Sequence, residues 1–474
     1  MATASDAPAR TFKFPTAYTI LFGLIIAVAA ATWVVPAGQY DRKKNEQLDK
    51  DVPVPGTYKT VEPSPQGLRA VLIAPIAGFY NPDSNQAAAI DVALFVLVIG
   101  GFLGVVTKTG AIDAGIGGAM AGLKGNEKWM IPILMALFAA GGTIYGMAEE
   151  SLAFYALIIP VMIAAGYDAL TGVAIIMLGA GIGTLGSTIN PFATVIASNA
   201  AGVPFTTGMP LRFAILGAGW LAGVVYVMRY AERVRKDPSK SLVADMTKSN
   251  REHFLKSRSE SGTPVLTGVR SLILVIFGLS FAIMIWGVSS AGWWMAQMSA
   301  LFLAASILVA LIVRMGEEDF TTTFVNGARD LLGVALVIGI ARGIVVIMDA
   351  GKITDTILFW SEKAVNGLGT VAFINVMFVL ELVLSFFVPS SSGLAVLTMP
   401  IMAPLADFSN VGRDVVVTAY QSANGLLNLV NPTFAVVMGG LAIGRVPYNR
   451  WLQFTWPLVL VLAVIIVVAI SLAA

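Results

Sequence analysis

Residues 170–203 read LTGVAIIMLGAGIGTLGSTINPFATVIASNAAGV, an apolar stretch interrupted by Asn190-Pro191. It is too long for one straight crossing of a bilayer, whose hydrocarbon core requires about 20 apolar residues in a helix. Proline lacks the amide hydrogen that continues a helix, so Asn190-Pro191 predicts a break inside the membrane. Residues 413–445 form a second long stretch, with Asn431-Pro432 inside it. Together they predict two discontinuous transmembrane helices, which line binding cavities in carriers.

The composition of the whole chain agrees with a membrane protein. Of its 474 residues, 57% are hydrophobic and 12% are charged, and the mean hydropathy is +0.80. A soluble domain carries about 25% charged residues. There is no cysteine, the single histidine is His253 in a charged segment, and the net charge is +2. We therefore expect an all-α polytopic membrane protein that is not an enzyme and has no cofactor, no nucleic-acid partner and no metal site apart from Na⁺.

The apolar stretches predict nine full spans and two re-entrant hairpins. Residues 129–166 and 370–406 are apolar on both sides of a polar break, which is typical of a hairpin whose turn is buried in protein or lines a water-filled cavity. A signal peptide is the less favoured interpretation of the first stretch, because its apolar run is longer than the core of such peptides. The predicted spans lie near residues 17–36, 87–107, 170–203, 208–229, 268–290, 293–313, 331–350, 413–445 and 451–473.

Basic residues predict the orientation. Ten lysines and arginines occur between residues 229 and 270, and the positive-inside rule makes this linker cytoplasmic. Counting spans from the linker predicts a cytoplasmic N-terminus and an extracytoplasmic C-terminus, in a bacterial inner membrane. The expected divisions of the chain are residues 1–86 (first span and outer loop), 87–230 (first repeat), 231–267 (basic linker), 268–315 (scaffold helices) and 316–474 (second repeat).

An internal repeat relates the two halves of the chain. The span count places the start of the first copy outside and that of the second inside, so the copies are expected to be inverted. Carriers built from inverted repeats bind substrate near the midplane, where their discontinuous helices meet. Four landmarks recur in order at offsets of 239 to 241 residues: LVIG at 97–100 and 336–339, GAI at 110–112 and GKI at 351–353, IIPVM at 158–162 and TMPIM at 398–402, and Asn-Pro at 190–191 and 431–432.

The break of the first predicted hairpin is acidic. Residues 141–151 read GGTIYGMAEES, so Glu149 and Glu150 are adjacent at membrane depth. A charged residue there costs about 2.5–3.5 kcal/mol, and adjacent carboxylates repel, so one of them could take up a proton. We expect Glu149, Glu150 and Ser151 to bind substrate. The alternative is that the tip reaches the membrane surface and its carboxylates are simply solvated.

The break of the second predicted hairpin is uncharged and rich in hydroxyl groups. Residues 389–393 read PSSSG. Ser390, Ser391 and Ser392 can coordinate a sodium ion or donate to a carboxylate, and a helix that begins at the break favours anions. We expect these three serines to bind substrate; the alternative is a polar turn at the membrane surface.

The discontinuous helices supply amide groups. Gln421, Asn424, Asn428 and Asn431 are spaced three or four residues apart, which places them on one helical face. We expect Asn190, Asn424, Asn428 and Asn431 to line the site, the alternative being that they join helices to one another. Carbonyl groups freed beside the prolines could bind a cation. The predicted cation-coupling residues are Thr143, Gly146, Glu149, Ser187, Thr188, Asn190, Pro191, Ser391, Gly393, Asn431 and Pro432.

Arg342 is the one arginine well inside an apolar span. An arginine in this setting binds a substrate carboxylate or forms an ion pair. The sequence leaves both alternatives open, with Asp349 or Glu381 as the partner in an ion pair.

Several blocks of the sequence resemble a known family of transporters. FPTAYTILFGLIIAVAAATWVVPAGQYDR at 14–42, VPGTY at 54–58, PQG at 65–67 and GGTIYGMAEES at 141–151 are similar to the YfcC branch of the DcuC (C4-dicarboxylate anaerobic carrier) family, in the ion-transporter superfamily. The resemblance implies a homodimer in which each protomer has a scaffold and an elevator-like transport domain with two hairpins. Divalent-anion transporters of the superfamily have Ser-Asn-Thr at both tips, whereas this chain has Glu149-Glu150-Ser151 and Ser390-Ser391-Ser392.

The acidic tip favours one substrate class over another. A cationic or zwitterionic amino acid would find carboxylates for its amino groups, and amides or Arg342 for its carboxylate. We therefore expect a Na⁺- or H⁺-coupled symporter or exchanger of amino acids, basic ones such as arginine and ornithine above all. The alternative is a coupled carrier of C4-dicarboxylates or other small organic acids. A channel or a membrane enzyme is less favoured, because inverted repeats suit alternating access and no nucleophile–base pair is visible in the sequence.

Overall fold

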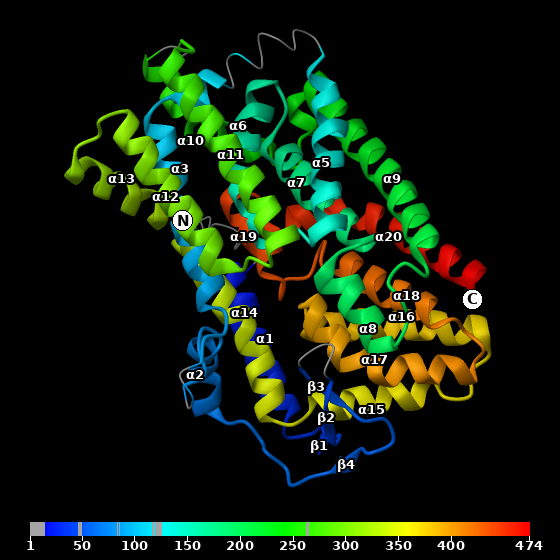
Figure 1. The fold of residues 1–474 in the computed structure, drawn as a ribbon. Helices are drawn as coiled ribbons and strands as arrows, with labels where there is room; N and C mark the ends of the chain where they lie inside the picture. The colour runs from blue at the N-terminus through cyan, green and yellow to red at the C-terminus, as the bar shows by residue number, and fades with distance from the viewer. Residues whose placement is uncertain are drawn as a thin grey trace, which may run out of the picture.

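The structure is a computed structural model, and it describes residues 15–45, 50–82, 84, 86–115, 118, 126–261 and 265–474. Helices make up most of the described residues (Figure 1). Nine of the described helical segments are long and apolar enough to cross a membrane: Ile90–Lys108, Glu127–Tyr145, Met209–Lys236, Gly268–Val288, Met295–Ile312, Leu332–Ala350, Thr370–Phe387, Ser391–Phe408 and Tyr448–Ala473. The expectation of a multi-pass helical membrane protein is confirmed.

These nine segments are not the nine spans predicted from the sequence. The predicted span 17–36 is a helix of 15 residues, α1 (Ala17–Ala31). The predicted spans 170–203 and 413–445 are each divided into two helices. Three segments of full length come instead from the predicted hairpins, at 127–145, 370–387 and 391–408. Three of the four hairpin arms are therefore as long as ordinary spans, whereas the second arm of the first hairpin, at residues 152–164, has 13 residues.

The segment after α1 contains strands, so the expectation of a purely α-helical fold is wrong there. β1 (Gly38–Gln39) pairs with β4 (Lys59–Thr60), and β2 (Arg42–Asn45) pairs with β3 (Lys50–Pro53), both antiparallel. A short helix, α2 (Leu68–Ala77), follows. This loop is rich in charged and polar residues, and its backbone groups are satisfied between neighbouring strands rather than within a helix.

The two halves contain the same elements in the same order. Each has a long helix, a helical hairpin, a divided helix and a final long helix. In the second half α15 (Thr354–Val365) also precedes the hairpin, and the matching part of the first half lies partly outside the described residues. In the first half the elements are α3 (Ile90–Lys108), α5 (Met130–Tyr145), α6 (Leu152–Ala164), α7 (Ala169–Leu185), α8 (Ile196–Ala201) and α9 (Met209–Lys236), and in the second α14 (Leu332–Ala350), α16 (Thr370–Phe387), α17 (Ser391–Phe408), α18 (Arg413–Leu427), α19 (Ala435–Gly444) and α20 (Tyr448–Ala473).

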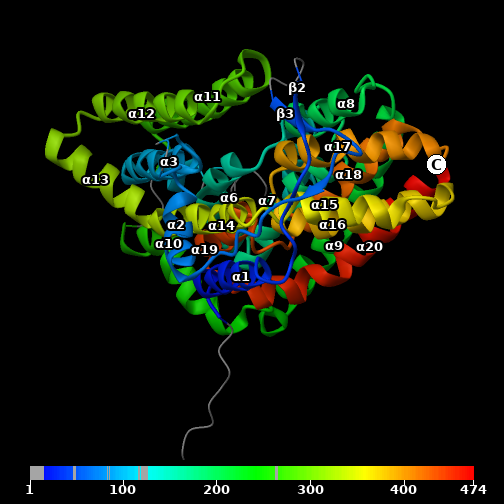
Figure 2. The same ribbon diagram turned by 90° about the horizontal axis from the view of Figure 1, so that it is seen from below.

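Four helices connect the halves: α10 (Thr247–Ser261), α11 (Gly268–Ala291), α12 (Met295–Ile312) and α13 (Glu317–Asp330). In Figure 2, α11 to α13 form an arm at one side of the molecule, and α15 to α18 lie at the other. The arm packs on α3. A Cβ atom at Gly100 of α3 would lie only 2.6 Å from the carbonyl oxygen of Gly327 on α13, so the two backbones are in direct contact.

Each Asn-Pro break is capped by its own asparagine. The side-chain oxygen of Asn190 accepts hydrogen bonds from the amides of Phe192 (2.8 Å) and Ala193 (3.2 Å). That of Asn431 accepts one from the amide of Thr433 (3.1 Å). The amide hydrogens that follow each proline therefore have partners without a continuous helix. The break is thus built into the local sequence.

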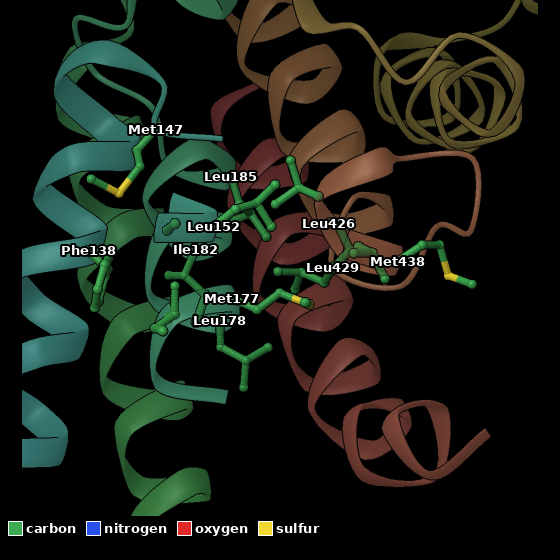
Figure 3. Close-up of a cluster of buried hydrophobic side chains, with 14 of the residues drawn as sticks. Phe138, Met147, Leu152, Met177, Leu178, Ile182, Leu185, Leu426, Leu429 and Met438 are labelled. Carbon is green, nitrogen blue, oxygen red and sulfur yellow. The ribbon is translucent and has the colours of Figure 1, made fainter. Parts of the chain in front are cut away.

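The divided helices cross at the centre of the molecule. Apolar side chains of α5 and α7 meet those of α18 and α19 there (Figure 3), among them Phe138, Ile182, Leu185 and Leu426, which are 2% exposed or less. A Cβ atom at Gly425 would lie 2.5 Å from the Cα atom of Leu185, so α18 touches the backbone of α7. This crossing brings both breaks and both hairpin tips to one place.

Candidate functional site

A cavity of about 510 Å³ lies between the two hairpin tips. Both divided helices, α14 and the start of α12 complete its wall. Eleven of the residues predicted to bind substrate or cation line this cavity: Gly146, Glu149, Glu150, Ser151, Asn190, Arg342, Ser390, Ser391, Ser392, Asn424 and Asn428. The structure thus brings together groups that are up to 282 residues apart in the chain.

One side of the cavity is acidic. Glu150 is 6% exposed and accepts a hydrogen bond from the Ala148 amide at 3.1 Å, within the tip itself, and Glu149 is half-buried. The structure adds Asp91 at the start of α3, whose carboxylate accepts a hydrogen bond from the indole of Trp294 at 2.8 Å. The Trp294 ring also packs on Phe192, with ring centroids 5.6 Å apart. Three carboxyl groups and two aromatic rings therefore share one wall.

Sequence reasoning did not find Asp91, Phe192 or Trp294. Asp91 and Trp294 each stand near the beginning of a predicted span, 87–107 and 293–313, where they look like ordinary residues of a membrane boundary. No spacing connects either to residue 149. Only the packing of α3 and α12 beside the first hairpin does so.

The wall of the cavity also carries the cation Arg342. Its side chain is exposed and forms no ion pair or hydrogen bond with the residues that the structure describes. Of the two partners considered above, Asp349 accepts a hydrogen bond from Thr354 at 3.0 Å, and Glu381 is fully buried. Asp349 lies near enough for an electrostatic interaction with Arg342, and both line the second cavity, but neither acid forms an ion pair or hydrogen bond with the guanidinium. Its N–H groups are therefore available to a ligand.

The second hairpin tip presents three serines. Ser390 caps α17 by accepting a hydrogen bond from the Gly393 amide at 3.2 Å. The Ser391 carbonyl accepts one from the hydroxyl of Tyr420 on α18. The serine hydroxyls thus face the cavity at the beginning of a helix, where its free amides favour an anion.

The four amides of the predicted stripe divide into two pairs. Asn424 and Asn428 line the cavity; Asn424 donates to the Ser385 hydroxyl at 3.0 Å, and Asn428 donates to the Pro389 carbonyl at 3.1 Å. Gln421 and Asn431 lie behind the wall. Gln421 donates to the Ser187 carbonyl at 2.7 Å, and Asn431 donates to the Ser385 carbonyl at 3.1 Å. Asn424 and Asn428 thus face the cavity, whereas Gln421 and Asn431 connect helices to one another.

The predicted coupling residues of the first half behave similarly. The hydroxyls of Thr143 and Thr188 are 3.0 Å apart, and the Thr188 amide donates to Thr143 at 2.9 Å. Ser187 is bonded to Thr194 at 2.8 Å. These contacts connect α5 to the Asn190-Pro191 break. None of these three side chains lines the main cavity, and neither do the predicted coupling residues Pro191, Asn431 and Pro432.

Two buried polar atoms in the cavity wall have no hydrogen-bond partner among the described residues. They are the hydroxyl oxygen of Ser151, on the acidic tip, and the side-chain oxygen of Asn428, beside the serine tip. Buried polar atoms are nearly always satisfied, so a rearrangement of the tips around a ligand would supply these two with a partner.

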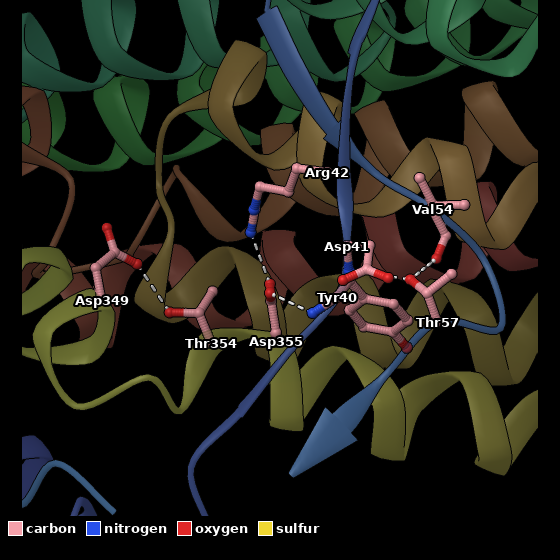
Figure 4. A network of polar contacts seen from close by, with 8 residues as sticks. All are labelled: Tyr40, Asp41, Arg42, Val54, Thr57, Asp349, Thr354 and Asp355. Atoms are coloured by element: carbon pink, nitrogen blue, oxygen red, sulfur yellow. Dashed lines mark hydrogen bonds and ion pairs between the residues drawn. The ribbon is translucent and has the colours of Figure 1, made fainter. Parts of the chain in front are cut away.

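A second cavity of about 520 Å³ adjoins the first. The two share Arg342, Ser390 and Ser392, and the second extends to the strands that follow α1. Gly393, predicted as a coupling residue, faces this second cavity. Figure 4 shows part of its charged wall: Arg42 pairs with Asp355 at 2.9 Å, and Asp355 also accepts a hydrogen bond from the Tyr40 amide at 3.0 Å. The second cavity thus forms a charged vestibule beside the main cavity.

Comparison with known proteins identifies the family of this chain. The model of the family described as C4-dicarboxylate anaerobic carrier, DcuC, matches residues 14–474. This chain belongs to the DcuC family. It is a membrane transporter, as that family and its relatives indicate.

Two relatives are similar over nearly their whole length. An uncharacterized protein of Haemophilus influenzae is 36% identical over 98% of this chain and 98% of its own length. A protein of Escherichia coli named "Putative basic amino acid antiporter YfcC" is 32% identical over 95% of this chain and 94% of its own length. The resemblance to the YfcC branch is confirmed.

Solved transporter structures are similar at a lower level. MtrF of Neisseria gonorrhoeae has a TM-score of 0.43 at 14% identity, over 97% of this chain and 95% of that one. The YdaH transporter of Alcanivorax borkumensis has a TM-score of 0.39 at 14% identity, over 97% and 98%. Scores at this level say nothing about the position of a site.

Proposed function

We propose that this protein is a secondary active transporter of amino acids, and of basic amino acids above all. The observation that carries the proposal is the set of charged groups in the main cavity: the carboxyl groups of Glu149, Glu150 and Asp91, together with the guanidinium of Arg342 and the hydroxyls of the serine tip. A basic amino acid has the complementary pattern, with two cationic groups and one carboxylate.

The binding mode follows from this pattern. Arg342 would hold the substrate carboxylate through paired hydrogen bonds, which a planar guanidinium forms well, with help from the serine hydroxyls. The cationic group of the substrate side chain would lie between Glu149 and Asp91 and against the face of the Trp294 ring, since cations bind to aromatic faces. The unpartnered oxygens of Ser151 and Asn428 accept hydrogen bonds from the amino groups.

A C4-dicarboxylate is the second candidate, because the family is described by that substrate. The same cavity suits it less well. Two substrate carboxylates would meet Arg342 as the one cationic side chain in the wall, and would lie in the same cavity as Glu149 and Glu150. Both glutamates would have to be protonated, since like charges in a poorly solvated site repel strongly.

For the transport step we propose an elevator movement. The repeated order of elements supports two inverted repeats, which would bind substrate near the midplane. Binding of substrate with Na⁺ or H⁺ would order both tips, and the loaded hairpins and divided helices would then move against a scaffold held in a homodimer. Exchange of one amino acid for another is supported by the name of the Escherichia coli relative. The basic linker would lie in the cytoplasm.

Counterflow in proteoliposomes tests the substrate directly. Vesicles loaded with unlabelled arginine should accumulate labelled arginine, and excess ornithine or lysine should compete while succinate and fumarate should not. Arg342→Gln should abolish the exchange, and the exposed Arg314→Gln serves as a matched control that should retain it. Competition by succinate and fumarate alone would replace this proposal with the second candidate.

A further inference from the structure

Glu381 is a buried acid that the proposed binding mode does not use. It lies on α16, in the first arm of the second hairpin, and does not line the main cavity. Its side chain is 0% exposed, and neither carboxyl oxygen has a hydrogen-bond partner among the described residues. An ionised carboxylate in this position would be uncompensated, and proteins avoid that by keeping such a group neutral. In this conformation Glu381 therefore carries a proton.

A purely structural role does not explain why an acid occupies position 381. An apolar side chain of similar size would fill the same space without leaving unsatisfied oxygens, and it would cost less. A buried polar group without partners is an exception that calls for a role of its own. Acidic residues inside transmembrane segments are rare, and they mark ion pathways and proton relays.

No charged group offsets Glu381 within the described residues of the elements that pack on α16, which are α15, α17, α18 and α20. On α17 the Thr398 hydroxyl approaches the carboxyl but donates to the Leu394 carbonyl at 3.0 Å. On α18 it faces the uncharged hydroxyl of Tyr420. The charged groups of these elements lie elsewhere or are engaged: Asp355 with Arg42, Glu362 with Tyr40, Lys363 over Phe359, Asp407 with Arg413, Asp414 beside Arg212, and Arg450 in the first turn of α20.

Glu381 is nevertheless connected to the substrate cavity from two sides. Ser385 lies one turn further along α16, on the same face, and accepts a hydrogen bond from Asn424, which lines the cavity. Tyr420, which faces Glu381, donates to the carbonyl of Ser391 at the hairpin tip. The helix that carries the acid and the phenol beside it are therefore both fastened to groups that contact substrate.

We propose that Glu381 is the proton-binding site of this transporter, and that its proton is held while the second hairpin tip is closed on α18. When the tip separates from α18, water reaches the carboxyl, its O–H bond breaks, and the proton passes to water and leaves a carboxylate. The carboxylate must regain a proton before the tip can close on bound substrate, whereas the empty domain returns without that proton. One proton therefore crosses the membrane with each substrate molecule.

This inference rests on the proposed function and deepens it by naming the proton as a coupling ligand. The test compares Glu381→Gln, which imitates the neutral acid, with the exposed control Glu318→Gln in the full-length protein. In proteoliposomes, Glu381→Gln should retain arginine counterflow, which needs no net proton movement, and should lose accumulation driven by a pH gradient. Glu318→Gln should retain both. Gradient-driven accumulation by Glu381→Gln at the wild-type level would overturn the proposal.

A second measurement does not depend on the substrate. In detergent, the thermal midpoint of Glu381→Gln minus that of the wild type should increase as the pH rises, because the unfolded wild type then releases a proton that its folded state still holds at Glu381, whereas the variant has no such proton. A difference that stays constant with pH would contradict the proton site. If Gln at this position prevents folding, Glu381→Met provides the same comparison. Failure of wild-type arginine counterflow would refute the substrate proposal alone, since the midpoint difference would still report on Glu381.

Discussion

The two hairpin tips occupy corresponding places in the two halves and yet differ in chemistry. The first presents Glu149 and Glu150 at a short turn, and the second presents Ser390, Ser391 and Ser392 at the start of a helix. One tip therefore attracts cations, and the other offers hydroxyls and helix amides to an anion. The difference fits the proposed substrate, which has cationic groups at one end and a carboxylate at the other.

The largest effect is expected from removing the acidic tip. Glu149→Gln combined with Glu150→Gln should weaken binding of basic amino acids by about 2–5 kcal/mol, because the substrate cation would be buried without its partners. Binding of neutral amino acids should change less. Thermal-shift titrations with arginine and with alanine measure both. Unchanged uptake and unchanged pH dependence in the double variant would remove the first tip from the site.

A smaller loss is expected from neutralising Arg342. Arg342→Gln should cost about 1.5–3 kcal/mol of binding free energy for arginine, which is the usual contribution of hydrogen bonds to a charged group. Arginine amide has no carboxylate. It should therefore bind more weakly than arginine, and with the same affinity to the wild type and to Arg342→Gln. Titration of the two ligands against the two proteins gives the coupling energy directly. A coupling energy near zero would show that Arg342 does not bind the substrate carboxylate.

The tips also differ in backbone geometry, which two glycines test. Gly146 ends α5 with φ +75°, and a Cβ atom there would lie 2.7 Å from the Asn190 side chain. Gly146→Ala should therefore reduce the free energy of unfolding by about 1–3 kcal/mol. At the second tip, a Cβ atom at Gly393 would meet Ser390 at 3.2 Å without a left-handed backbone, so Gly393→Ala should remain within about 1 kcal/mol of the wild type. Thermal unfolding of both variants, without substrate, makes the comparison.

The smallest effect is expected in the basic linker, and it helps to assign pH effects to the tips. Burial, with a contribution from Arg445, lowers the pKa of the His253 imidazole below 6.5. Stability from the neutral imidazole is thus present above the unfolded value and is lost as the pH falls below it. His253→Gln should remove a small loss of stability between about pH 7 and pH 5, small because the side chain is exposed and solvent screens its charge. A pH dependence of transport that survives in His253→Gln does not come from this residue.

The sequence predicted much of the fold because local signals are strong in a membrane. Apolar length located the helices, and the two Asn-Pro pairs located the breaks, since proline removes a backbone donor wherever it lies. It failed at α1, where the helix stops at Ala31 although the sequence remains apolar, and at β1 to β4. These elements are short, and the contacts that select them come from distant residues, such as Asp355 beneath Tyr40.

For the site, spacing alone could indicate which residues share a face but not which face meets a ligand. The stripe from Gln421 to Asn431 was one unit in the sequence, yet only Asn424 and Asn428 line the cavity. The close contact of α18 with α7 at Gly425 determines which of these amides reach the cavity. No local sequence pattern describes that contact.

The sequence by itself determined the class of protein, the breaks and the chemistry of each tip, because hydropathy, proline and charge act locally. Only the tertiary structure decided that the two tips share one cavity, that Asp91 and Trp294 join it, and that Arg342 is unpaired while Glu381 is buried. The reason is physical: burial and pairing depend on which helices cross, and that is a property of the whole packed chain.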